Sequence, residues 1–231
     1  MEAILLAGGQ AERLGDAAQG RPKPLVPVGG RPLVAYALAR FARAGVGRVV
    51  IACAEGTGAL FERELAGIGP EIVAVEEPEP LGRGGALRFA AQALREEGPV
   101  FAMNGDELLD VDLGILMKRH REREPAATLT LVPLRSQFGV VDLDDDDVVT
   151  GFREAPQLPH WVNAGLYVLG EEAIEQLPER GDHETTTFPL LAARRRLLGY
   201  RHLGTWLTVN TPKELRLAEE FVGSHPDWLS A

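Results

Sequence analysis

The most informative stretch of the sequence is Ile4-Leu5-Leu6-Ala7-Gly8-Gly9-Gln10-Ala11-Glu12-Arg13-Leu14, which is followed by Arg21-Pro22-Lys23-Pro24-Leu25. An apolar run that ends directly in two glycines predicts a buried strand with an exposed turn at its carboxyl end. Glycine accepts positive φ and has no side chain, so the backbone N–H groups of such a turn can face a ligand. Because one arginine and one lysine follow closely, this stretch suits a bound polyphosphate.

Lys23 is the most informative of these cations. It lies between Pro22 and Pro24, and proline restricts the backbone on both sides of it. The stretch lacks the Gly-Lys-Ser/Thr of a P-loop and the Gly-x-Gly-x-x-Gly of a dinucleotide fold. Taken alone, the two glycines also fit a simple strand-to-helix turn with solvated cations, so both interpretations stay open at this point.

The composition is that of an ordinary globular domain. The 231 residues are 45% hydrophobic and 25% charged, and a chain of this length can bury a sizeable core. The net charge of −10 argues against nucleic acid or an anionic membrane as a partner, because both need a basic face. Cys53 is the sole cysteine. With no internal disulfide, no signal peptide and no membrane-spanning apolar run, we expect a cytoplasmic protein.

Strands and helices alternate through the first half. Apolar runs predict strands at residues 2–7, 48–53, 71–76 and 99–103. Helices are predicted from about residue 31 to Gly45, at 59–66, from Gly84 to Gly98, and after Asp112 as N-cap. This order is typical of βαβ units. It predicts an α/β fold of three layers, a Rossmann-like, doubly wound mixed sheet in a single domain.

The second half is richer in strands and is expected to be more antiparallel, extending or capping the same sheet. Strand-like runs occupy residues 127–134, 140–143, 148–152 and 162–169, and another lies near 200–209. Helices are predicted at 171–177, 187–197 and 211–222. Residues 142–147 contain five carboxylates. We interpret them as a hairpin turn, since they lack the spacing and glycine of a calcium loop.

The pattern Leu-Ala-Gly-Gly-x-x-x-Arg-Leu, then Pro-Lys-Pro-Leu-x-Pro-Val-x-Gly-x-Pro, resembles the signature of the sugar-phosphate nucleotidyltransferases. The resemblance implies a glycine loop that holds a nucleoside triphosphate, at Leu6, Ala7, Gly8 and Gly9. It also implies that Arg13 and Lys23 contact the phosphates as catalytic residues. The family's Gly-Thr before the arginine is Ala11-Glu12 here.

Two further motifs of the first half fit the same family. Glu77-Pro78-Glu79-Pro80-Leu81-Gly82-Arg83-Gly84-Gly85-Ala86 resembles its nucleoside-binding box, which assigns nucleotide binding to Glu77, Gly82, Gly84 and Gly85. The alternative for these glycines is a plain helix N-terminus. Asn104-Gly105-Asp106 follows a central strand, where ligands bind in doubly wound sheets. The resemblance makes Asp106 a catalytic ligand of Mg²⁺.

The acceptor side resembles the family less completely. The resemblance assigns sugar-phosphate binding to Gly139, Glu154, Asn163 and Gly165. The lysine expected after the glutamate is Ala155, with Arg153 or Arg135 as alternative cations. The aspartate expected as second Mg²⁺ ligand is Thr208, and a hydroxyl is a much weaker ligand than a carboxylate.

The resemblance covers almost all of residues 1–231 and implies transfer of a nucleotidyl group from an NTP to a sugar 1-phosphate. It is strongest to small mannose- or heptose-phosphate guanylyltransferases. Residues 1–125 would bind the nucleotide and 126–231 the sugar phosphate. Two alternatives remain: a nucleotide-binding relative without turnover, favoured by Ala155 and Thr208, and a metal-dependent glycosyltransferase using Asp110-Val111-Asp112. The oligomeric state is open, with a homo-oligomer as one alternative.

Overall fold

The first strand lies inside a large mixed sheet. In the computed structural model, which describes residues 1–9 and 11–229, β1 (Glu2–Leu6) is flanked by β4 and β6 in a seven-stranded sheet of order β12-β8-β11-β6-β1-β4-β5. The other strands are β4 (Arg48–Ala54), β5 (Glu71–Glu77), β6 (Val100–Asn104), β8 (Ala127–Arg135), β11 (Gln157–Leu169) and β12 (Leu197–Arg201). Only β11 is antiparallel to its neighbours.

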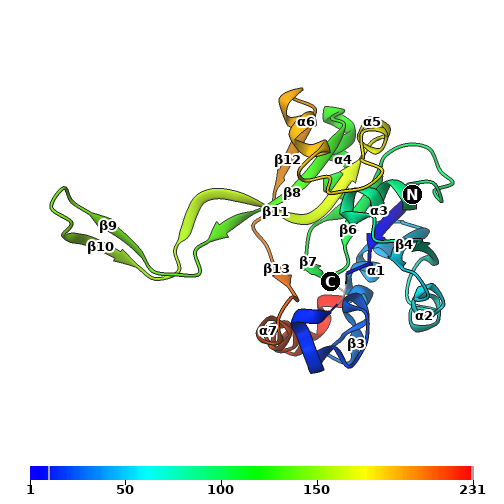
Figure 1. Cartoon of the computed structure of the whole chain (residues 1–231), viewed down its shortest axis with the longest axis horizontal. Coiled ribbons are helices and arrows are strands. Elements are labelled where there is room, and N and C mark those ends of the chain that lie inside the picture. Colours follow the sequence, from blue (N-terminus) through cyan, green and yellow to red (C-terminus); the bar gives the residue numbers. More distant parts are fainter. Residues whose placement is uncertain (10, 230–231) are drawn as a thin grey trace.

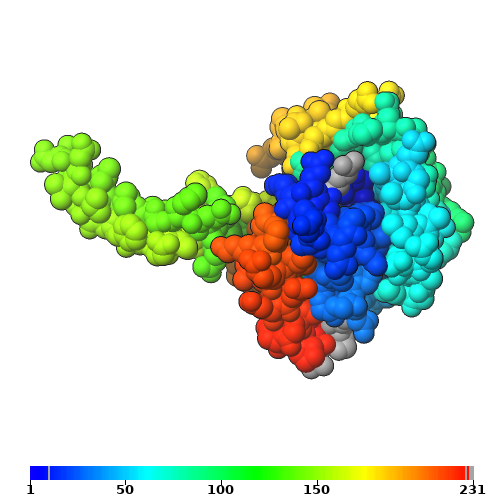
Figure 2. All heavy atoms as spheres, turned by 60° about the horizontal axis from the view of Figure 1, so that its bottom comes forward, coloured from blue at the N-terminus to red at the C-terminus, as the bar shows by residue number. Residues whose placement is uncertain are grey.

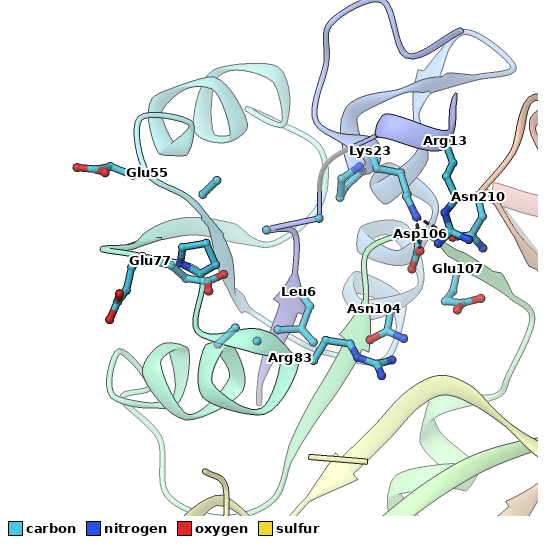
Figure 3. Close-up of a pocket in the computed structure, with 18 of the residues that line it drawn as sticks. Leu6, Arg13, Lys23, Glu55, Glu77, Arg83, Asn104, Asp106, Glu107 and Asn210 are labelled. Atoms are coloured by element: carbon cyan, nitrogen blue, oxygen red, sulfur yellow. Dashed lines mark hydrogen bonds and ion pairs between the residues drawn. The ribbon is translucent and has the colours of Figure 1, made fainter. Parts of the chain in front are cut away.

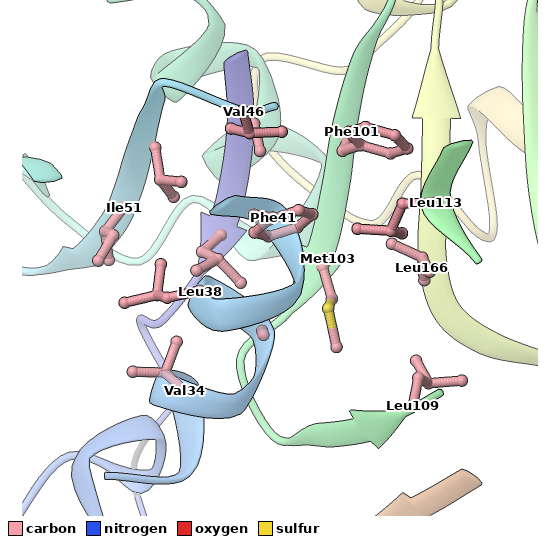
Figure 4. Close-up of a cluster of buried hydrophobic side chains, with 14 of the residues drawn as sticks. Val34, Leu38, Phe41, Val46, Ile51, Phe101, Met103, Leu109, Leu113 and Leu166 are labelled. Atoms are coloured by element: carbon pink, nitrogen blue, oxygen red, sulfur yellow. The ribbon is translucent and has the colours of Figure 1, made fainter. Parts of the chain in front are cut away.

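Helices cover both faces of this sheet (Figure 1). One core cluster joins α1 (Leu33–Arg43), α2 (Gly58–Glu64) and α4 (Leu113–Arg123) to one face, and Figure 4 shows Phe41 of α1 beside Phe101 of β6. A second cluster joins α3 (Gly82–Ala91), α5 (Glu171–Glu175) and α6 (Thr187–Ala193) to the other face. Side chains along β1 alternate between the two clusters, Leu5 in the first and Ile4 in the second. The predicted three-layer, doubly wound fold is confirmed.

Several element boundaries differ from the prediction. Helix α3 ends at Ala91, not at Gly98, and α6 ends at Ala193, so that Leu197 already belongs to β12. The single strand expected near 200–209 is two strands, β12 and β13 (Trp206–Thr208). Strand β7 (Glu107–Leu109) was not predicted and pairs with β13. Three residues carry too little alternation for a sequence pattern to reveal a strand.

The C-terminal helix α7 (Pro212–Ser224) supports the segment that follows the glycine turn. Its Leu215 and Ala218 share a third buried cluster with Leu14 and Val26. Thr211 and Glu214 form a capping box that fixes the start of this helix. The short elements of this region are η1 (Glu12–Ala18), η2 (Lys23–Leu25), β2 (Pro27–Val28), β3 (Arg31–Pro32) and η3 (Pro226–Leu229).

A two-stranded arm, residues 136–156, extends away from the body (Figures 1 and 2). Its strands β9 (Val140–Leu143) and β10 (Val149–Arg153) are antiparallel, and a backbone hydrogen bond from Ser136 to Pro156 closes its base. The predicted hairpin turn is confirmed, because Asp144 accepts bonds from the N–H groups of Asp146 and Val148. In the described part of the chain, no helix is long and apolar enough to cross a membrane.

Candidate active site

A cavity of about 870 Å³ opens where β1, β5 and β6 end (Figure 3). This is the carboxyl edge of the parallel strands, where ligands bind in doubly wound folds. The predicted residues that line it are Leu6, Gly8, Gly9, Arg13, Lys23, Glu77, Gly82 and Asp106. The glycine turn, the two cations and the proposed metal ligand, which are up to 98 positions apart, therefore share one cavity.

Lys23 joins two edges of this cavity. Its Nζ donates to Asp106 Oδ2 at 2.9 Å and to Asn210 Oδ1 at 2.7 Å. The side chain is only 13% exposed, so these bonds are partly shielded from water. Two of the three ammonium donors thus hold the turn after β6 and the segment before α7 in place, and an ammonium has one donor more. Asn210 was not predicted.

Gly8 and Glu77 form part of the wall opposite Lys23. A Cβ at Gly8 would lie 2.6 Å from Glu77 Oε1, so this position excludes a larger side chain while Glu77 stays in place. Glu77 Oε2 accepts a bond from the Leu81 N–H at 3.1 Å. Burial raises the pKa of the Glu77 carboxyl. The wall therefore presents a rigid glutamate beside the glycine turn.

The remaining predicted nucleotide residues have packing roles. A Cβ at Gly84 would lie 2.7 Å from His183 N, and one at Gly85 would lie 2.6 Å from Glu179 O. Both glycines let the start of α3 press against residues 178–183, and of the three glycines of this box only Gly82 lines the cavity. Ala7 is buried in the core and its N–H bonds to Ala52 O.

Arg83, which was not predicted, connects the cavity to a polar network behind it. Its guanidinium donates to Asp182 and to Glu184. Asn163 Nδ2 in turn donates to Glu184 Oε1 and to Tyr167 Oη, each at 2.7 Å. The predicted sugar ligand Asn163 thus lies behind the cavity, outside its lining, and its amide nitrogen already donates to Tyr167 and Glu184.

Three polar residues meet at the end of β6, Asn104, Asp106 and Glu107 (Figure 3). Trp206 Nε1 donates to Glu107 Oε2 at 2.8 Å. Burial, with the neighbouring charge of Asp106, raises the pKa of Glu107 well above its ordinary value. Glu107 was missed although it directly follows the Asn-Gly-Asp motif, because a second acidic residue in a turn is no signal without the strand pairing that buries it.

The predicted position of the second metal ligand lies beside this group. Thr208 of β13 is paired directly with Glu107 of β7. Its Oγ1 donates to Glu214 Oε1 at 3.4 Å. Gly165, with φ of +72°, passes so close that a Cβ would lie 2.5 Å from Asn104 Nδ2. Its lack of a side chain lets β11 run under this corner of the cavity.

These oxygen donors fit Mg²⁺. Two carboxylates, Asp106 and Glu107, line the cavity with Asn104, whose Oδ1 is buried without a hydrogen-bond partner. Mg²⁺ is commonly held by one or two carboxylates together with substrate phosphates. Within residues 1–9 and 11–229, no group of three or more His, Cys, Asp or Glu is arranged to hold a metal ion. Substrate oxygens would therefore have to complete the coordination.

Gly139 and Glu154 lie at the base of the arm, outside the cavity lining. They are close to each other, since a Cβ at Gly139 would lie 3.2 Å from Glu154 Oε2. Ala155 has a positive φ of 43°, which is uncommon for a residue with a side chain. Arg153, one of the two alternative cations, pairs with Asp142 across the arm through both terminal nitrogens. The structure does not bring this group to the glycine turn.

The sequence of the chain matches a known family. A family model described as "Nucleotidyl transferase" matches residues 2–224. The chain belongs to this family. Mannose-1-phosphate guanylyltransferase of Mycobacterium tuberculosis is 33% identical over 228 residues, which cover 93% of this chain and 62% of that protein. The enzyme of the same name from Pichia angusta is 33% identical over 230 residues, with the same coverage. The chain spans about three fifths of the length of these relatives.

Solved structures share the fold. A putative glucose-1-phosphate thymidylyltransferase from Bacillus anthracis, in complex with sucrose, superimposes with a TM-score of 0.76 at 18% identity, covering 96% of this chain and 94% of that one. HddC from Yersinia pseudotuberculosis, complexed with GMP-PN, gives 0.73 at 21% identity, covering 95% and 98%. At these identities the likeness supports the predicted single-domain fold.

Proposed function

We propose that this chain transfers a nucleotidyl group from an NTP to a sugar 1-phosphate, giving an NDP-sugar and pyrophosphate. The observation that carries the proposal is the bond of Lys23 to Asp106 at the glycine-turn end of one cavity. It joins a phosphate-binding cation to a metal-binding carboxylate. GTP and mannose 1-phosphate, or a related sugar phosphate, are the best substrate pair, because relatives matched over 93% of the chain are named mannose-1-phosphate guanylyltransferases.

The reaction needs alignment and neutralisation of charge more than covalent help. An oxygen of the sugar phosphate would attack the α-phosphorus of the NTP, and the bond from that phosphorus to the pyrophosphate oxygen would break in line. Arg13 and Lys23 would bind the triphosphate and neutralise charge on the departing pyrophosphate. The turn at Gly8 and Gly9 would supply backbone N–H groups to the phosphates.

Asp106 would hold Mg²⁺, together with oxygens of the bound nucleotide. The ion would supply positive charge to the phosphate oxygens as the bond to pyrophosphate breaks. Lys23 has a second role here, because its bond to Asp106 Oδ2 fixes the orientation of that carboxylate before any ligand arrives. Lys23 and the ion would then both supply positive charge to the same triphosphate.

The sugar phosphate would bind beside β11 and the base of the arm. Gly165 lies under the corner formed by Asn104 and Glu107, which connects the sugar side to the metal side. Asn163 would act through its network with Glu184, and Gly139 and Glu154 would contribute from the arm. We keep the division into a nucleotide-binding half, about 1–125, and a sugar-phosphate-binding half, about 126–231, as part of this proposal.

A nucleotide-binding relative without turnover is the second candidate, and Ala155 favours it. The glycosyltransferase alternative has less support, because both aspartates of its motif are occupied. Asp110 Oδ1 accepts a bond from the Thr205 N–H and lies 2.7 Å from His202 Nε2. Asp112 caps α4 by accepting from the Ile115 N–H.

Pyrophosphate release separates these candidates. The chain would be incubated in Mg²⁺ with each pair from a panel of NTPs and sugar 1-phosphates, with Asp106→Asn as the inactive variant and Asp145→Asn, at the exposed tip of the arm, as its matched control. We expect release with at least one guanylyl pair, retained in Asp145→Asn and lost in Asp106→Asn. Measurable NTP binding without release from any pair would reject the transferase and leave the binding protein.

A further inference from the structure

The expected second metal ligand position, Thr208, carries no carboxylate, but its neighbour Glu107 does. The two residues are direct partners across the β7–β13 pair. The hydroxyl of Thr208 bonds to Glu214, which also accepts the Asn210 N–H and the Thr211 N–H as part of the cap of α7. Position 208 therefore serves the helix cap, whereas position 107, one strand away, carries a carboxylate.

Glu107 lines the same cavity as Asp106, and it also borders a small space beside α1. The Trp206 indole donates to its Oε2, and the Asn104 side chain lies beside it, next to Gly165. Across the described chain, no cation lies within ion-pair distance of Glu107, while Lys23 is paired with Asp106. Lys23 acts on Glu107 only at longer range. A shielded carboxylate without an ion-pair partner is costly, and a divalent cation beside it would offset that cost.

Asn104 supplies an independent observation. Its Oδ1 is buried without any hydrogen-bond partner. A buried amide oxygen normally has a donor, so an orphaned one at a cavity wall is available to a water molecule or a cation. The orphaned oxygen belongs to a residue that lines the cavity together with Asp106 and Glu107.

We propose that Glu107 provides the second carboxylate of the Mg²⁺ site, in place of the aspartate absent at Thr208, with Asn104 Oδ1 beside it. The second acidic ligand would then come from β7 instead of β13, and the site would keep two carboxylates. This inference rests on the proposed function, because a nucleotide must supply the remaining oxygens. It also removes Thr208 as an argument against turnover.

Mn²⁺ binding tests this without turnover. Mn²⁺ is titrated into the full chain with and without a non-hydrolysable GTP analogue, and free Mn²⁺ is followed by electron paramagnetic resonance. We expect Glu107→Gln to weaken nucleotide-dependent Mn²⁺ binding by about tenfold or more. The double variant Glu107→Gln/Thr208→Asp should recover most of that loss. Glu55→Gln, which removes another carboxylate from the cavity lining, should bind Mn²⁺ like the unaltered chain.

The outcomes are distinct from those of the pyrophosphate assay. Unaltered Mn²⁺ affinity in Glu107→Gln overturns the inference, and if the unaltered chain still releases pyrophosphate the proposed function stands. A loss of Mn²⁺ affinity in Glu107→Gln that is not recovered in the double variant, with thermal unfolding unchanged, also overturns the inference that Glu107 replaces a ligand at position 208. Conversely, Mn²⁺ binding that depends on Glu107 in a chain that releases no pyrophosphate supports the inference and rejects the function.

Discussion

Replacing Lys23 by Met is the sharpest test of the phosphate-binding end of the cavity. Met keeps most of the side-chain volume and removes the ammonium. The change breaks two hydrogen bonds, at 2.9 Å to Asp106 and 2.7 Å to Asn210, in a side chain only 13% exposed. Hydrogen bonds to charged groups contribute about 1.5–3 kcal/mol each. Because Asp106 is itself 24% exposed and regains water, we expect the free energy of unfolding to fall by about 1–3 kcal/mol in total.

The effect on nucleotide affinity is separable from that loss. If the third ammonium donor binds a phosphate beyond the α-phosphate, Lys23→Met removes one charge-assisted bond from GTP and none from GMP. A loss of about 1.5–3 kcal/mol corresponds to a roughly 10- to 100-fold weaker GTP complex. GMP affinity should change by less than about threefold, because GMP lacks the phosphates that Lys23 would contact. A tenfold change would correspond to about 1.4 kcal/mol.

Calorimetric titration with GTP and GMP measures both affinities, and urea denaturation measures the stability. Lys118→Met is the matched control, because Lys118 is 74% exposed on α4 and pairs with the exposed Glu122 at 3.8 Å. Equal losses for GTP and GMP would mean that Lys23 supports the fold and not the phosphates. Unchanged GTP affinity would mean that the glycine turn does not bind a triphosphate.

Two further predictions concern the packing around the site and the buried histidines. Gly165→Ala should lower the free energy of unfolding by about 1–3 kcal/mol, because its φ is positive, and should also weaken Mn²⁺ binding, because its Cβ would displace Asn104. Gly67→Ala is the control, since Gly67 has a φ of +76° and open space around it. In urea denaturation and Mn²⁺ titration it should show only the loss of stability. Burial lowers the pKa of His120 and of His183 to about 4. Between about pH 6.5 and pH 4 these histidines are protonated in the unfolded chain but neutral in the folded one. The free energy of unfolding should therefore fall as the pH drops through this range, by up to about 3 kcal/mol per histidine. Denaturation at several pH values measures this slope. A His120→Gln variant with an equally steep slope would contradict the part assigned to His120.

The parallel half of the fold was predictable because each of its strands is a continuous apolar run ended by glycine or a polar turn. β1, β4, β5 and β6 lie within a residue or two of their expected bounds. Topology then explains why the site residues of this half meet, since the carboxyl ends of adjacent parallel strands share one edge. Leu6, Glu77 and Asp106 reach the same cavity for that reason.

The residues that were missed depend on contacts between distant segments. Glu107 matters because β7 pairs with β13, and both strands are only three residues long. Asn210 matters because Lys23 reaches it over 187 positions. Gly84 and Gly85 fit a nucleotide-binding box by sequence. In the structure they must lack side chains because residues 178–183 pack against the start of α3. No local pattern carries these pairings.

The two departures from the family pattern have different physical consequences. The carboxylate missing at Thr208 has a neighbour in register, Glu107, that lines the cavity and, in our proposal, takes its place. The missing lysine at Ala155 has no such neighbour on the arm, because Arg153 is held by Asp142 on the adjacent strand. Arg83 is another cation on the cavity wall, and it bonds to Asp182 and Glu184. Since those two carboxylates already offset its charge, Arg83 is a weak substitute for the missing lysine. Under the proposed function, we therefore expect added positive charge on the acceptor side to raise turnover most.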